Sequence, residues 1–120
     1  MTKAKPRVSR AFLLEAKNAV LGKRYELSVA FVTSSLMKAY NKKFRGKPVP
    51  TDILSFPLSA LSGEILFSMA EVRKQAPLFG RTPENFLSFL FIHGLIHLKG
   101  YTHGSTMEAQ EKKFRKKFNI

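Results

Sequence analysis

The chain of 120 residues contains three histidines, and all of them fall within one short segment as His93, His97 and His103. A spacing of four residues places the rings of His93 and His97 on one face of a helix, one turn apart. Gly100 follows them and is able to take the left-handed conformation that ends a helix and turns the chain back. His103 can then approach the first two rings from a loop. Three neutral imidazoles arranged in this way leave one position of a tetrahedral zinc ion open to water, as a catalytic site requires.

The same segment matches the zinc-peptidase signature H-E-x-x-H-x-x-G-x-x-H except at its second position, where Gly94 replaces the general-base glutamate. Glycine cannot accept a proton, so the chain has the metal-binding histidines of this signature but not its general base. A lone histidine on an apolar helix is usually a hydrogen-bonded core residue. Three clustered histidines in a chain without cysteine instead predict one metal ion per chain. Imidazole-only ligation favours Zn²⁺, although nickel, copper and iron also accept imidazole.

Three polar residues elsewhere are further candidates for the site, each with a plainer alternative. Arg45 stands beside Gly46, where a planar guanidinium can bind a phosphate through two hydrogen bonds. The alternative is that this segment is a solvated basic loop. Asp52 either takes part in the same anion-binding site or only caps a turn. Glu64 opens an apolar strand, either as an ordinary strand-end charge or as a proton-handling or ligand-orienting group near the metal.

The charge of the chain is strongly positive, with 21 basic and 8 acidic residues and a formal net charge of +13. Fourteen of the basic residues lie in three clusters, within residues 3–10, 38–47 and 112–117. Such a field attracts polyanions, of which nucleic acid is the commonest. The alternatives are anionic lipid headgroups and a merely solvated surface. The residues expected to bind nucleic acid are Lys42, Lys43, Arg45 and Lys47.

The spacing of apolar residues predicts the elements that position these side chains. The predicted helices span 10–21, 34–44, 69–76, 83–99 and 105–118, and the predicted strands span 26–33, 52–58 and 64–68. Residues 1–120 are therefore expected to form one α+β domain, in which helices pack on a small mixed sheet. The helix at 83–99 is apolar on nearly all sides, so we expect it to be buried at the centre and to hold two ligand histidines rigidly.

The composition also bears on location. Without cysteine, neither a disulfide framework nor a thiolate metal site is possible, which fits the cytoplasm. The basic amino terminus has no following apolar segment of the kind that a secretory signal needs. The longest apolar stretch, 86–98, is too short to span a bilayer. We therefore expect a soluble cytoplasmic protein with no membrane contact.

Three motifs in this order resemble the YbeY family, the bacterial rRNA maturation factors and endoribonucleases. The first, Phe44-Arg-Gly-Lys47 with Pro50-Thr-Asp-Ile-Leu-Ser-Phe-Pro57, is similar to the family's YRGKxxPTDVLSFP stretch. The second is Gly63-Glu-Ile65, and the third is the histidine segment His93-Gly-x-x-His97-Leu-x-Gly100-Tyr-x-His103. Together the motifs cover roughly residues 36–107.

This resemblance implies zinc on the three histidines and an Arg45 that serves the substrate phosphate. It also implies a small α+β metallohydrolase that cleaves single-stranded RNA during 3′-end maturation of small-subunit rRNA. Small-subunit ribosomal proteins and a ribosome-assembly GTPase are the implied partners. The chain departs from the family pattern at Thr102, where an aspartate is usual before the third histidine. It also has a reduced or missing opening strand, a trimmed loop between Pro57 and Gly63, and lysines at an end that is commonly acidic.

The leading hypothesis is therefore a zinc-dependent endoribonuclease that acts in rRNA maturation. Because Gly94 cannot act as a base, the base would be a zinc hydroxide, Glu64 or the 2′-OH of the RNA itself. The alternative is a non-catalytic, zinc-containing ribosome-assembly factor that binds rRNA. A third hypothesis is a metal-dependent hydrolase of another substrate, recruited by the positive charge.

Overall fold

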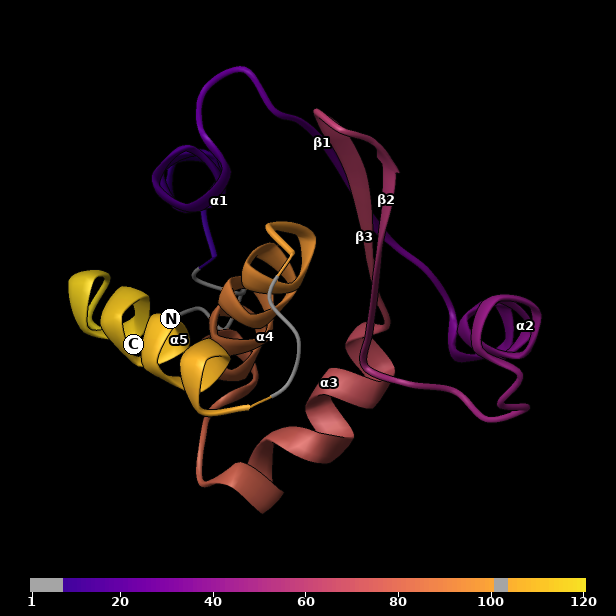
Figure 1. Ribbon diagram of the computed structural model, residues 1–120. Helices are drawn as coiled ribbons and strands as arrows, with labels where there is room; N and C mark the ends of the chain where they lie inside the picture. Colours follow the sequence, from indigo (N-terminus) through magenta and orange to yellow (C-terminus); the bar gives the residue numbers. More distant parts are fainter. Residues whose placement is uncertain (1–7, 101–103) are drawn as a thin grey trace.

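The computed structural model describes residues 8–100 and 104–120 (Figure 1). Three strands form one mixed sheet in the order β1-β3-β2, with β1 parallel and β2 antiparallel to β3. This confirms the predicted α+β class. The strands are β1 (Glu26–Phe31), β2 (Ile53–Ser59) and β3 (Ser62–Phe67), and the helices are α1 (Arg10–Leu21), α2 (Ser34–Arg45), α3 (Met69–Gln75), the 3₁₀ helix η1 (Ala76–Phe79), α4 (Pro83–Leu98) and α5 (Ser105–Lys117).

Most boundaries agree with the predicted ranges, and the exceptions have local causes. The strand predicted to reach residue 33 ends at Phe31, because Thr33 caps α2 by accepting a hydrogen bond from the backbone N–H of Leu36 at 3.1 Å. The turn between the strands predicted at 52–58 and 64–68 is shorter than those ranges imply. Ser59 and Ser62 are joined through their hydroxyls at 2.7 Å, and β3 begins at Ser62. The expectation of a reduced or missing opening strand falls on the amino-terminal part of the chain, where residues 1–7 lie outside the described residues.

The sheet lies between helix α2 and three of the other helices. In Figure 1, α1, α4 and α5 lie on one side of the sheet and α2 lies on the other. Helix α4 begins as predicted, with Pro83 in its first turn and Thr82 accepting a hydrogen bond from Asn85 N at 3.1 Å. Phe91 and Leu95 are fully buried within it. No helix in residues 8–100 or 104–120 is both long enough and apolar enough to cross a membrane.

Gly94 is a point of close approach between α4 and the sheet. A Cβ atom at this position would lie 3.0 Å from Cδ1 of Ile53 and 3.1 Å from Cδ1 of Ile65. At those distances the ends of the Ile53 and Ile65 side chains must shift by a few tenths of an ångström before a larger residue fits at position 94. The zinc peptidases place their glutamate at this point of the motif, and here the same position faces two isoleucine side chains of the sheet.

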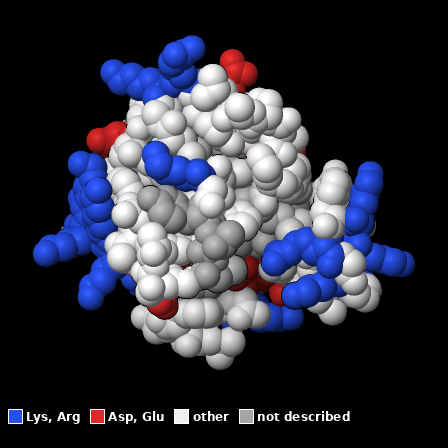
Figure 2. Space-filling model, in the orientation of Figure 1, with Lys and Arg blue, Asp and Glu red and all other residues white. Residues whose placement is uncertain are grey.

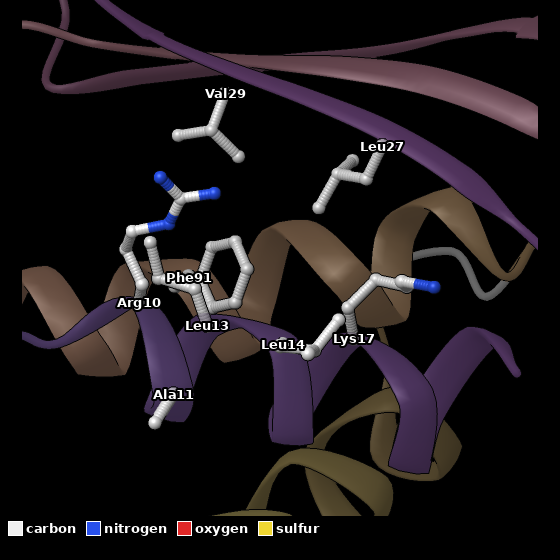
Figure 3. A pocket seen from close by; sticks show the side chains of 8 residues that line it. All are labelled: Arg10, Ala11, Leu13, Leu14, Lys17, Leu27, Val29 and Phe91. Atoms are coloured by element: carbon white, nitrogen blue, oxygen red, sulfur yellow. The ribbon is translucent and has the colours of Figure 1, made fainter. Parts of the chain in front are cut away.

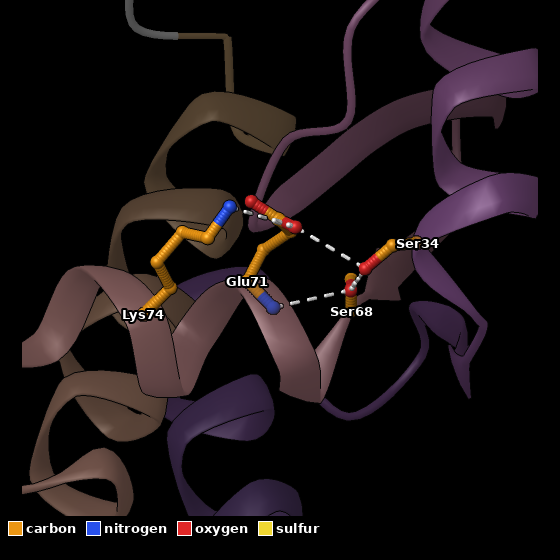
Figure 4. A network of polar contacts seen from close by, with 4 residues as sticks. All are labelled: Ser34, Ser68, Glu71 and Lys74. Atoms are coloured by element: carbon orange, nitrogen blue, oxygen red, sulfur yellow. Dashed lines mark hydrogen bonds and ion pairs between the residues drawn. The ribbon is translucent and has the colours of Figure 1, made fainter.

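The first turn of α2 is anchored to α3 by a polar network (Figure 4). Ser34 Oγ donates to the carboxylate of Glu71 at 3.2 Å and lies 3.3 Å from Ser68 Oγ. Ser68 caps α3 by accepting from Glu71 N at 3.3 Å, and Lys74 lies 4.0 Å from the same carboxylate. Since Glu71 is buried, these bonds fix the orientation of α2, whose other end carries Arg45.

Candidate functional site at the edge of β2

A cavity of about 230 Å³ lies along the outer edge of β2 and brings three of the predicted site residues together. Helix α2 contributes Arg45 from its last turn, and α4 contributes His93 and His97. Residues 53–56 of β2 lie between them. The sequence placed Arg45 and the histidines in separate motifs about fifty residues apart, and the fold places them around one hollow.

The loop after α2 is anchored so that Arg45 stays at this hollow. Asn41 is buried, and its side-chain amide donates to the carbonyl of Val49 at 2.8 Å. The backbone N–H of Lys47 reaches the carbonyl of Asn41 at 3.3 Å. Gly46 takes the left-handed conformation with φ of 71° and ends the helix one residue later than predicted. The guanidinium of Arg45 remains exposed to solvent, where a substrate can reach it.

His93 is oriented by a carboxylate that the sequence analysis did not identify. Its Nδ1 lies 2.9 Å from Oε2 of Glu111 on α5, and Glu111 is only 8 % exposed. Arg115 Nη1 approaches the other carboxylate oxygen at 3.5 Å. A carboxylate at Nδ1 favours the tautomer with its proton on that nitrogen, which leaves Nε2 as the metal-binding atom. Carboxylate–histidine pairs of this kind orient ligands in zinc sites.

The outer edge of β2 supplies backbone donors and acceptors to the cavity. The backbone N–H of Ser68 donates to the carbonyl of Asp52 at 3.0 Å. The hydrogen-bonding groups of the Asp52 backbone therefore point toward β3. In an antiparallel ladder this direction alternates, so the N–H and C=O of Ile53 and Ser55 point outward. Within residues 8–100 and 104–120, no strand pairs with this edge. The Ser55 N–H is therefore directed toward the cavity that it lines.

Asp52 lies at the start of this edge. Its contacts bear on both roles considered for it, as a turn cap and as part of the site. Burial raises the pKa of its carboxyl group above the ordinary value, and hydrogen bonds from the Ile53 and Asp52 backbones oppose that rise. The hydroxyl of Thr51 lies 3.4 Å from Oδ1, and these contacts cap the start of β2. A positive charge on His93 also lowers the pKa of Asp52, so the carboxyl group lies within electrostatic range of the site.

The structure does not bring Glu64 to this cavity. Ile65 points toward α4, where its Cδ1 meets the Gly94 position. Neighbouring side chains alternate along a strand, so Glu64 points to the α2 side of the sheet. It is paired there with Phe56 across the ladder. The third predicted ligand, His103, lies outside the described residues, as does Thr102.

Two of the three predicted basic clusters lie on separate elements, one at the end of α2 beside the cavity and the other along α5. Lys42, Lys43 and Lys47 are exposed at the carboxyl end of α2 and just beyond it. The second cluster follows Glu111 along α5. Figure 2 shows basic side chains gathered at two opposite sides of the molecule, over α2 and over α5, with a paler surface between them. A polyanion that reached from one cluster to the other would pass between α2 and α5.

A second hollow, of about 330 Å³, lies between α1 and β1 (Figure 3). Its walls are the apolar side chains of Leu13, Leu14, Leu27 and Val29. Lys17 lies at one end, where its ammonium group donates to the carbonyls of Gly22 and Lys23 at 3.3 Å. Among the described residues that line this hollow there is no histidine and no carboxylate, so it offers neither a metal ligand nor a proton acceptor.

The fold and the cavity define a class of protein: a small α+β domain with a histidine pair on a buried helix, facing an arginine around the edge of a mixed sheet. The family model described as Endoribonuclease YbeY matches residues 2–119, and the chain belongs to that family. It is 39% identical over 98 residues to Endoribonuclease YbeY of Cutibacterium acnes and 37% identical over 105 residues to that of Halalkalibacterium halodurans.

These alignments cover 71% and 74% of the chain but 63% and 65% of the two relatives, so the chain spans less than two thirds of their length. The fold comparison reaches further along the chain. The solution structure of TM1509 from Thermotoga maritima matches with a TM-score of 0.61 at 31% identity. That match covers 91% of this chain and 83% of the other.

Proposed function

We propose that this chain is a zinc-dependent endoribonuclease that cleaves single-stranded RNA and acts in 3′-end maturation of small-subunit rRNA. The observation that carries the proposal is the cavity at the edge of β2, where Arg45 meets His93 and His97. The names of the related proteins support the activity. The excess of basic residues supports a polyanionic substrate.

The residues of the cavity fit a zinc ion. His93 has its Nδ1 engaged by Glu111, and His97 lies one turn further along α4 and lines the same cavity. His103 is the third ligand in this proposal. A bound zinc ion would lower the pKa of a water molecule and polarise a phosphoryl oxygen. Glu111, held between His93 and Arg115, would keep the imidazole in the tautomer that binds metal.

Arg45 and the edge of β2 would hold the scissile phosphate. Guanidinium groups bind phosphate through two parallel hydrogen bonds, and Arg45 lines the cavity opposite the histidines. The outward N–H of Ser55 is a second donor on the same wall. As negative charge develops on the phosphoryl oxygens, both donors would stabilise it without reorganising. Arg45 is therefore proposed to act on the transition state as well as on binding.

The proposed reaction also needs a proton acceptor. Among the described residues that line the cavity there is no carboxylate, and Glu64 points to the other side of the sheet. The nucleophile is therefore either a water molecule or the 2′-OH of the RNA. A 2′,3′-cyclic phosphate end on the product would identify the 2′-OH, because water leaves an open phosphate.

The test is cleavage of a defined single-stranded RNA by highly purified protein, with a His97→Ala variant prepared in parallel. We expect the wild-type protein to cut the single strand, to spare a perfect duplex, and to lose the activity with the substitution. Equal cleavage by both preparations would mean that a contaminating nuclease is responsible. Mapping of the product ends in the same samples distinguishes the two nucleophiles.

A non-catalytic assembly factor is the second candidate, because the described lining lacks a carboxylate base. In that case zinc would be structural, and the basic surfaces on α2 and α5 would bind rRNA in the cytoplasm. Small-subunit ribosomal proteins and a ribosome-assembly GTPase are proposed partners in either case. Tight, metal-dependent RNA binding without cleavage would favour this second role.

A further inference from the structure

Three aromatic rings form a continuous stack beside the histidine cavity. The ring centroids of Tyr40 and Phe44 are 6.0 Å apart at an interplanar angle of 23°, and those of Phe44 and Phe56 are 5.2 Å apart at 24°. Phe44 and Phe56 both line the cavity, and Phe44 precedes Arg45 in the chain. The stack therefore extends from α2 to the edge strand at the point where the substrate phosphate is proposed to bind.

Phe44 lies between the other two rings and is still 50% exposed. Near-parallel rings with centroids 5.2 and 6.0 Å apart are offset, so Tyr40 and Phe56 cover its faces only in part. The ammonium group of Lys43 lies 5.4 Å from the centroid of its ring. Lys43 is itself exposed, and a cation–aromatic contact at an exposed site is weak, so an incoming group can displace it. An accessible aromatic ring surrounded by cations is the combination with which proteins bind single-stranded nucleic acid.

Phe79 shows what an exposed aromatic ring looks like elsewhere on the same molecule. It is 55% exposed and stacks on Phe86 with centroids 4.9 Å apart at 24°. Its surroundings differ from those of Phe44, since it lies on η1 and lines neither the histidine cavity nor the hollow beside β1. The two rings are matched in exposure and in packing but not in position, which makes Phe79 the natural control.

We propose that Phe44 is a stacking platform for one unpaired base of the substrate, next to the phosphate that Arg45 binds. This inference rests on the proposed function and specifies which part of a single-stranded RNA the rim of the cavity recognises. In a duplex, both faces of a base are covered by its neighbours and its edge is paired. Only an unpaired base can move onto the ring, so the platform gives a physical reason for single-strand preference.

The sequence makes a direct optical test possible, because the chain contains no tryptophan. Phe44→Trp introduces one fluorophore at the platform, and Phe79→Trp introduces one at the control position. Each variant is titrated with a short single-stranded oligonucleotide that carries 2′-O-methyl groups and cannot be cleaved through its 2′-OH. We expect strong quenching at position 44, little at position 79, and little at either position with a duplex of the same sequence. Equal responses at the two positions would overturn the proposal.

Affinity measurements with the same oligonucleotide supply the second arm. Phe44→Leu removes base stacking on an aromatic ring and should weaken binding about tenfold. Phe44→Tyr should retain the wild-type affinity, and Phe79→Leu should leave the affinity unchanged. Unchanged affinity in Phe44→Leu would overturn the platform. Neither the fluorescence titration nor the affinity measurement requires cleavage of the RNA. If the fluorescence is quenched but the protein cleaves no RNA, the result supports the platform and contradicts the proposed activity. Cleavage without quenching overturns the platform alone.

Discussion

The two outer strands of one three-stranded sheet each border a hollow, and only one of these two hollows is lined by histidine side chains. The larger hollow, of about 330 Å³ beside β1, is walled by aliphatic side chains of α1 and the strand. The smaller one, of about 230 Å³ beside β2, contains two histidines and an arginine. Size therefore does not identify the site. What distinguishes the β2 side is that the end of α2 and the middle of α4 meet around an exposed strand edge.

The largest expected difference between the two hollows is in metal binding. We predict that His97→Ala lowers zinc affinity by about a thousandfold, since it removes one ligand from a site whose binding free energy is on the order of 10 kcal/mol. Leu14→Ala, in the hollow beside β1, should leave the affinity unchanged. Competition with a chromogenic chelator measures both variants. His97 is exposed, so its loss should not unfold the metal-free protein, and circular dichroism verifies this.

The next largest effect separates Arg45 from other surface cations. Arg45→Ala should slow single-turnover cleavage at saturating enzyme about a hundredfold, as expected for an oriented charge that acts on the transition state. Lys112→Ala should weaken RNA binding slightly and leave that rate unchanged, because its charge acts equally on ground and transition states. Identical saturated rates for the two variants would remove Arg45 from the reaction.

Glu111 provides a finer test, because its effect reaches the site only through His93. Glu111→Gln should lower zinc affinity about 10- to 100-fold, the usual cost of losing a carboxylate that orients a ligand histidine. Glu108 lies one turn earlier on α5 and is exposed, so Glu108→Gln should leave the zinc affinity unchanged. If both variants bound zinc as the wild type does, the Glu111–His93 contact at 2.9 Å would have no role in the site.

The smallest effect concerns Asp52, whose pKa is raised by burial above the ordinary value of 3.8. A raised pKa means that the folded state disfavours the charged form, so stability is lost as the pH rises through the folded pKa. Asp52→Asn should therefore stabilise the metal-free protein at pH 7 by roughly a few tenths of a kcal/mol, since partial exposure screens the charge. The difference should vanish below pH 3.8, where both forms of residue 52 are neutral. Urea unfolding at several pH values measures it, and a gap that widened at low pH would contradict the assignment.

Local patterns in the sequence were sufficient to predict the elements. The helix predicted at 83–99 is apolar on nearly all sides, which predicted its burial at the centre, and it begins at Pro83 as predicted. The two histidines share a face of that helix because a spacing of four is a local property. Several boundaries differed by one or two residues, and the short 3₁₀ helix η1 at Ala76–Phe79 was not predicted.

Contacts between distant elements could not be predicted in the same way. Glu111 meets His93 only because α5 packs on α4, although one local signal exists: Glu111 lies on the otherwise apolar face formed by Met107, Phe114 and Phe118. Glu64 was a plausible neighbour of the metal until the ladder register placed its side chain on the α2 side of the sheet. The role of Gly94 likewise depends on how closely α4 approaches Ile53 and Ile65.

The measurement that tests the central claim most directly is a zinc titration of RNA cleavage. Protein stripped of metal by chelation is supplied with increasing zinc, and single-turnover cleavage of one defined single-stranded RNA is followed alongside His97→Ala. We predict a rate that rises to a plateau at one zinc ion per chain in the wild type and stays at background in the variant. Full activity in the stripped protein, or the same zinc response from His97→Ala, would show that the histidine cavity is not the site of the reaction.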